Sequence, residues 1–167
     1  MKKSSFKFYW EDTLLEMLPS RALFLPETKE LLICDIHLGK AEYFQQNGIP
    51  LTNNSDKYNF ARIKKIVEKH SPEKLIILGD LFHSKYSIDK NLKKKVEDLP
   101  ELLNINIELV LGNHDNGCYI KNLKMLLNEI KTPTPFAFPL LVERLKNTLS
   151  NEPIEKRVEK LIKKYSN

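Results

Sequence analysis

The sequence is poor in glycine, in cysteine and in long hydrophobic runs. It has five glycines in 167 residues, about 3%, whereas about 7% is usual, so each glycine is expected where the backbone requires one. Two cysteines cannot form a disulfide framework, and Cys34 ends an apolar run that predicts its burial, which favours a reducing cytoplasm. The apolar runs are about four residues long, against the roughly 18 of a membrane span, and no signal-peptide core is present. We therefore expect a globular, cytoplasmic chain that does not associate with a membrane.

The charge is positive and unevenly distributed. The net charge is +5, and residues 140–167 carry seven Lys or Arg against four Glu, so +3 of the +5 lies in this segment. Two interpretations stay open: a solvated face of an amphipathic helix, or attraction to the phosphate backbone of a nucleic acid.

Short apolar runs alternate with helical patterns over the first 130 residues. The runs 22–25 and 31–34 flank a short polar turn and predict a β-hairpin. Strands that alternate with helices predict an α/β fold with a mostly parallel sheet and helices on its faces. The other predicted elements are a helix around 60–67, a strand at 75–78, a helix that Ser87 caps and Pro100 ends, a strand at 107–111 and a helix at 119–130.

The pattern changes near residue 131. Three prolines in nine residues up to Pro139 predict an extended linker at 132–139. Two helical patterns follow, which predict a basic helical tail at 140–167. The folded domain is accordingly expected to occupy residues 1–131.

Polar segments that contain glycine follow three of the predicted strands. They read Asp-Ile-His-Leu-Gly at 35–39, Gly-Asp-Leu-Phe-His at 79–83 and Gly-Asn-His-Asp at 112–115, and they hold three of the five glycines. Ligands of open α/β sheets bind beyond the carboxyl ends of the strands, so the three segments are expected to converge on one site.

The residue types in these segments are typical of a metal site. Carboxylates, imidazoles and an amide carbonyl form a mixed oxygen and nitrogen donor set, which suits Mn²⁺, Fe, Zn²⁺ or Mg²⁺. A carboxylate on the middle strand, Asp80, has the position to bridge two ions about 3.5–4 Å apart. Water bound between such ions becomes a nucleophile near neutral pH, while the ions hold the phosphoryl oxygens.

With these motifs in this order, the chain resembles the calcineurin-like metallophosphoesterase superfamily, and within it the DNA-ligase-associated (PdeM-type) branch. The likeness covers roughly residues 14–130, including Ala-Leu-Phe-Leu-Pro at 22–26 and Gly-Ile-Pro-Leu at 48–51. It implies an α/β sandwich of mixed, largely parallel sheets with flanking helices. It also implies two divalent ions, with Mn²⁺ the first choice. By resemblance, the metal ligands would be Asp35, His37, Asp80 and Asn113, His114 would act as the catalytic histidine with Asp115 orienting it, and His83 would support the ligands without binding a metal.

The later part of the family pattern is missing. The family continues with a metal-binding histidine and then Gly-His-x-His, but the four histidines of this chain end at His114, and His70 does not take their place. The first metal would keep Asp35, His37 and Asp80, and the second would be weakly held. We therefore expect a truncated or frame-shifted family member with an unrelated helical C-terminal tail.

The resemblance implies a metal-dependent phosphodiesterase that works by a metal-bound hydroxide in nucleic-acid repair, with DNA as a substrate and functional association with a DNA ligase and a helicase. Two alternatives stay open. In the first, the chain is a catalytically silent family member that binds nucleic acid or a protein partner. In the second, it is a general phosphomonoesterase. Oligomeric state has no signal in the sequence.

Overall fold

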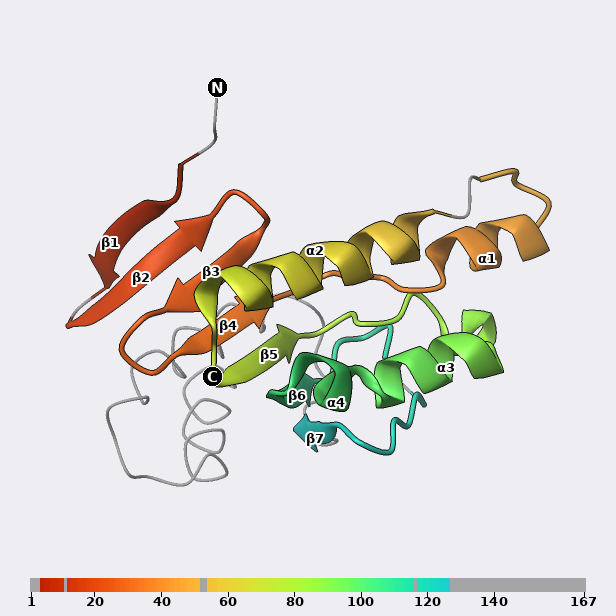
Figure 1. Ribbon diagram of the computed structural model, residues 1–167. Helices are drawn as coiled ribbons and strands as arrows, with labels where there is room; N and C mark the ends of the chain where they lie inside the picture. Colours follow the sequence, from red (N-terminus) through yellow and green to blue (C-terminus); the bar gives the residue numbers. More distant parts are fainter. Residues whose placement is uncertain (1–3, 11, 52–53, 116, 127–167) are drawn as a thin grey trace, which may run out of the picture.

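A computed structural model describes residues 4–10, 12–51, 54–115 and 117–126, which form one mixed seven-stranded sheet flanked by helices (Figure 1). The strands stand in the sheet in the same order as in the chain. The strands are β1 (Phe6–Trp10), β2 (Thr13–Leu18), β3 (Ala22–Leu25), β4 (Glu30–Ile33), β5 (Lys74–Leu78), β6 (Asn106–Val110) and β7 (Lys124–Leu126), and the helices are α1 (Lys40–Gln46), α2 (Ser55–His70), the 3₁₀ turn η1 (Lys85–Ser87), α3 (Lys90–Glu97) and α4 (Leu99–Leu103).

The first four strands pair antiparallel with their neighbours. The predicted hairpin is confirmed as β3 and β4, whereas β1 and β2 were not predicted. Four of the five residues of β1 are exposed, so this edge strand has no alternating apolar face for the sequence to reveal. The N-terminal half of the sheet is therefore antiparallel, and the sheet as a whole is less parallel than expected.

The last four strands are parallel, and the predicted α/β crossovers are confirmed. Helices α1 and α2 connect β4 to β5, and helices α3 and α4 connect β5 to β6. Strands β4 and β5 are buried along nearly their whole length, which explains why they read as unbroken apolar runs rather than alternating ones.

Alternate residues of the central strands supply two apolar clusters on opposite faces of the sheet. One face packs against α2, α3 and α4, which lie along it in Figure 1, and its cluster joins Leu31 and Ile77 to Ile63 of α2 and Val96 of α3. The other cluster is smaller, and in the described part of the chain it consists of strand residues. Its buried members are Leu15, Leu25, Leu32 and Ile76.

The second predicted helix begins and ends differently from the prediction. Asp89 caps α3, because its Oδ1 accepts a hydrogen bond from the Leu92 amide at 2.6 Å, whereas Ser87 belongs to the preceding 3₁₀ turn. Pro100 does not end the helical region. It lies in the first turn of α4, where a missing N–H leaves no helix hydrogen bond unmade.

The helix predicted at 119–130 is wrong. Residues 119–123 form an irregular segment with a turn at 121–122, and β7 follows as a strand parallel to β6. Ile120 and Leu123 are both buried, so their spacing of three reflects two contacts made from an irregular segment and not one face of a helix. The rest of that segment, the predicted linker at 132–139 and the tail at 140–167 lie outside the described residues.

Cys34 is exposed and not buried, because β4 ends at Ile33 and Cys34 begins the loop beyond the sheet. Among the described residues, no helix is both long enough and apolar enough to span a bilayer.

Candidate metal centre

The segments that follow β4 and β5 run side by side at the carboxyl ends of these parallel strands. The amide of His37 donates to the Asp80 carbonyl at 2.9 Å, and the amide of Leu38 donates to the Leu81 carbonyl at 2.8 Å. The amide of His83 donates back to the Leu38 carbonyl at 2.9 Å. These backbone bonds hold the Asp-Ile-His segment against the Gly-Asp segment, as the parallel-sheet prediction required.

Three of the predicted site residues have a left-handed backbone. The φ angles are 51° at Asp35, 48° at His37 and 53° at Asp80. Each such conformation costs an L-residue about 1–2 kcal/mol, and it persists only where the surroundings impose it. The inter-segment hydrogen bonds provide that constraint, and non-glycine residues of this kind gather at functional sites.

The third segment, after β6, approaches the second so closely that it requires glycine. A Cβ on Gly112 would overlap the carboxylate oxygen and the backbone nitrogen of Asp80. With hydrogen at that position, the Asp80 Oδ1 accepts a hydrogen bond from the His114 amide at 3.1 Å. One of the few glycines of the sequence thus occupies a position where no other residue fits.

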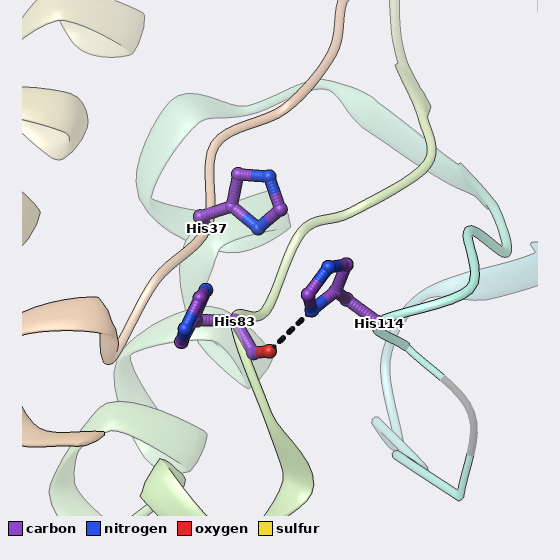
Figure 2. Close-up of side chains that lie close together, drawn as sticks. All are labelled: His37, His83 and His114. Atoms are coloured by element: carbon purple, nitrogen blue, oxygen red, sulfur yellow. Dashed lines mark hydrogen bonds between the residues drawn. The ribbon is translucent and has the colours of Figure 1, made fainter. Parts of the chain in front are cut away.

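Asp115 ties the second and third segments together. Its side chain is fully buried, with Oδ1 accepting from the Phe82 amide and Oδ2 from the Gly112 amide, both at 2.9 Å. Burial raises the pKa of Asp115, while the backbone amides oppose that shift. The Asp115 carboxylate therefore binds backbone amides and not the His114 ring. That ring is held instead by the His83 carbonyl, whose oxygen lies 2.6 Å from His114 Nδ1 (Figure 2).

Helix α2 holds the first segment from the other side. The Gly39 amide donates to Asp56 Oδ2 at 2.9 Å, and the Asn59 amide group donates to the Ile36 carbonyl at 3.1 Å. Burial raises the pKa of Asp56. Sequence reasoning missed both residues. The only signal was a pair of polar residues three apart at the start of a helix, which places them on one face.

Asp35, His37 and Asp80 form the first group that could hold a metal ion, called here the carboxylate group. One ligand atom from each lies within 4.8 Å of the others, and His37 Nε2 is 4.0 Å from Asp35 Oδ1. Asp80 is buried, His37 is partly buried and Asp35 is exposed. Two carboxylates and one imidazole are a suitable set for Mn²⁺, Fe or Zn²⁺, so the donors fit the predicted type of ion.

His37, His83 and His114 form a second group, called here the histidine triad, and Figure 2 shows the three rings facing one another. One nitrogen from each lies within 4.8 Å of the others. His83 was predicted only to support the ligands, so its place beside the other two rings is a structural result. Burial, together with the nearby His114 and His37, lowers the pKa of His83. The rings of Tyr43 and Phe44, on α1, pack against it at centroid distances of 5.0 and 5.6 Å.

Two further residues that the sequence singled out, Asn113 and His70, belong to neither group. Asn113 is exposed in the third segment, directly before His114. His70 belongs to neither group, because it ends α2 and packs on the ring of Phe24 at a centroid distance of 5.2 Å. Five of the seven predicted residues therefore lie in the two groups, while Asp115 holds the backbone of the loops and Asn113 is adjacent to His114 in the chain.

Comparisons with known proteins agree with this geometry. The family model described as calcineurin-like phosphoesterase matches residues 30–165. Among solved structures, the crystal structure of the Pseudomonas putida nuclease MPE is similar, with 26% sequence identity and a TM-score of 0.61. The alignment covers 75% of this chain and 64% of that one, so the chain spans less than two thirds of the nuclease. The comparison with curated proteins gave no match. The family model matches far more than half of the sequence, and the chain belongs to the calcineurin-like phosphoesterase family.

Proposed function

We propose that this chain is a metal-dependent phosphodiesterase that acts on nucleic acid. The observation that carries the proposal is the carboxylate group, in which ligand atoms of Asp35, His37 and Asp80 lie within 4.8 Å of one another. The group stands at the carboxyl ends of parallel strands, where α/β sheets bind their ligands. Membership in a phosphoesterase family agrees with an activity of this kind.

The carboxylate group and Asn113 are the proposed ligands of two divalent ions, with Mn²⁺ the first expected. Bound ions of this class polarise phosphoryl oxygens and lower the pKa of water. Asp80 would be a ligand of both ions. Its Oδ1 already accepts the His114 amide, which limits the orientations that the carboxylate can take.

His114 is the proposed catalytic histidine. A backbone carbonyl only accepts hydrogen bonds, so the contact with the His83 carbonyl requires the proton on His114 Nδ1. The other ring nitrogen, Nε2, is then left for the substrate, where a protonated imidazole would donate to the leaving oxygen. Asp115 acts as a positioning residue, because it binds the Gly112 amide in the segment of this histidine and the Phe82 amide in the segment of His83.

The preference for nucleic acid is supported by the similar structure being that of a nuclease and by the net charge of +5. Association with a DNA ligase and a helicase, a role in DNA repair and a cytoplasmic location stay predictions that rest on the branch resemblance. A phosphodiester of DNA is the substrate to test first, since phosphate contacts dominate nucleic-acid binding.

The test is hydrolysis of a chromogenic phosphodiester and of single-stranded DNA by the full chain with Mn²⁺. We expect Asp80→Asn and His114→Gln each to lower turnover by about 100-fold or more, in keeping with the loss of a metal ligand or of a general acid. His70→Gln and Asp98→Asn are matched controls outside the centre and should keep wild-type turnover. Equal turnover in all four variants would refute the proposal.

A second candidate function is a silent family member that binds nucleic acid without hydrolysing it. It is favoured by the histidine content, because no histidine follows His114 in the sequence and the second ion would keep only Asp80 and Asn113. Two protein ligands hold a metal ion poorly compared with the usual three or four. Absent turnover, combined with DNA affinity that falls steeply with salt, would support this function instead.

A further inference from the structure

We propose that the histidine triad is itself a binding site for one Zn²⁺ or a similar late transition-metal ion, which shares only His37 with the carboxylate group. The ion would be held by nitrogen atoms of His37, His83 and His114. This inference goes beyond the proposed function, because it does not require the chain to hydrolyse an ester.

The spacing of the rings is that of imidazoles around a tetrahedral ion. Nitrogen–zinc bonds of about 2.0–2.1 Å place ligand nitrogens about 3.3 Å apart and the ring centroids about 5 Å apart. In the triad, the centroid of His37 is 4.9 Å from that of His114 and 5.5 Å from that of His83, and the third distance is 5.3 Å. The centroids are therefore already at the required separation. Small side-chain rotations would bring nitrogens that lie within 4.8 Å to coordination distance.

Two ring nitrogens of the triad are buried without a partner. The Nδ1 atoms of His37 and His83 have no hydrogen-bond partner in the described part of the structure. Buried polar atoms are nearly always paired, so each unpaired one calls for an explanation such as an ion. The Nδ1 atom of His114, by contrast, has a partner, the His83 carbonyl. Metal-binding histidines usually make a bond of this kind with the nitrogen that does not bind the metal.

The surroundings hold the three rings in place. Each histidine comes from a different segment, and backbone hydrogen bonds together with the Asp115 carboxylate tie the segments to one another. Tyr43 and Phe44 cover one side of His83. An apolar wall of this kind limits access of water and is a usual feature around bound metals.

The donors select a different ion from that of the carboxylate group. Three imidazoles favour Zn²⁺, Ni²⁺ or Cu²⁺ over Mn²⁺, whereas the two carboxylates and one imidazole of the carboxylate group accept Mn²⁺ and Fe as well as Zn²⁺. Because His37 belongs to both groups, the two kinds of ion compete for it. Zinc on the triad would also occupy His114, so the metal that is supplied decides which of the two arrangements forms.

The experiment uses the full metal-free chain with ¹⁵N-labelled histidines and adds zinc chloride while the four imidazoles are followed by NMR. One equivalent of Zn²⁺ is expected to shift the ring nitrogens of the three triad residues and to leave those of His70 unchanged, which provides an internal control. Mg²⁺ should leave the His83 ring unchanged. Calorimetry is expected to show zinc affinity at least about tenfold weaker in His83→Gln and within about twofold of wild type in Asp35→Asn, with His70→Gln as the matched histidine control.

The opposite pattern would overturn the inference. If zinc shifts only His37, or if Asp35→Asn abolishes zinc binding while His83→Gln keeps it, then the ion lies on the carboxylate group. Circular dichroism of each variant establishes that a loss of affinity is not a loss of folding, and His114→Gln provides a second variant of the triad. Hydrolysis with Mn²⁺ is measured separately, so a failure of the zinc site and a failure of the proposed function give different results.

Discussion

Replacing Asp115 by asparagine tests whether this carboxylate holds the candidate site together. The side chain is fully buried, and each of its two oxygens accepts one backbone amide, from Phe82 and from Gly112. Asparagine has nearly the same shape but keeps only one acceptor oxygen. Its amide group must therefore place a donor against one of the two N–H groups, and that N–H is left unsatisfied.

The expected loss follows from these two bonds. A hydrogen bond to a charged group contributes about 1.5–3 kcal/mol, and a buried donor left without a partner costs about 1–3 kcal/mol. One bond is lost and the other becomes neutral, so Asp115→Asn should lower the free energy of unfolding by about 2–4 kcal/mol. For a chain of this size, that corresponds to a fall in Tm of about 5–15 °C.

The assay is urea unfolding of the metal-free chain, followed by circular dichroism. Asp98→Asn is the matched control, since Asp98 is exposed and its side chain makes no capping bond to α4. A surface change of this kind should stay within about 0.5 kcal/mol of wild type. If the two variants unfold at the same urea concentration, the two buried bonds do not hold the loops, and the assignment of Asp115 as a positioning residue is refuted.

Two other predictions concern the backbone and a histidine outside the centre. Gly112→Ala would drive a methyl group into the Asp80 carboxylate, so we expect a loss of about 1–3 kcal/mol in unfolding free energy, together with weaker Mn²⁺ binding in calorimetry. Wild-type values for both would show that the two segments can move apart. Burial lowers the pKa of His70 below 6.5, so the fold favours the neutral imidazole. The contribution of His70 to stability is therefore complete above the pKa of the unfolded chain, and it is lost as the pH falls through the pKa of the folded chain. An NMR titration of the His70 ring should have its midpoint below 6.5, and a midpoint at or above that value would contradict the burial argument.

The sequence predicted the elements whose signal is local. Strands β4, β5 and β6 are short apolar runs, and the crossover helices between them show helical spacing, so each could be recognised within its own segment. The convergence of the three polar segments followed from the parallel order of these strands. Strand β1 has no buried face, and the turn before β7 mimics a helical pattern, so both depend on pairing with a neighbouring strand that local sequence does not reveal.

The sequence by itself determined the family and the identity of the donors, because residue types and their order after each strand are written in the chain. Only the tertiary structure decided how these donors combine. The hydrogen bonds between segments impose the left-handed backbone at Asp35, His37 and Asp80, and they bring His83 into a triad with His37 and His114. The reason is physical: a loop conformation that is unfavourable alone is stabilised only by contacts between segments distant in the sequence, and those contacts exist only once the sheet has formed.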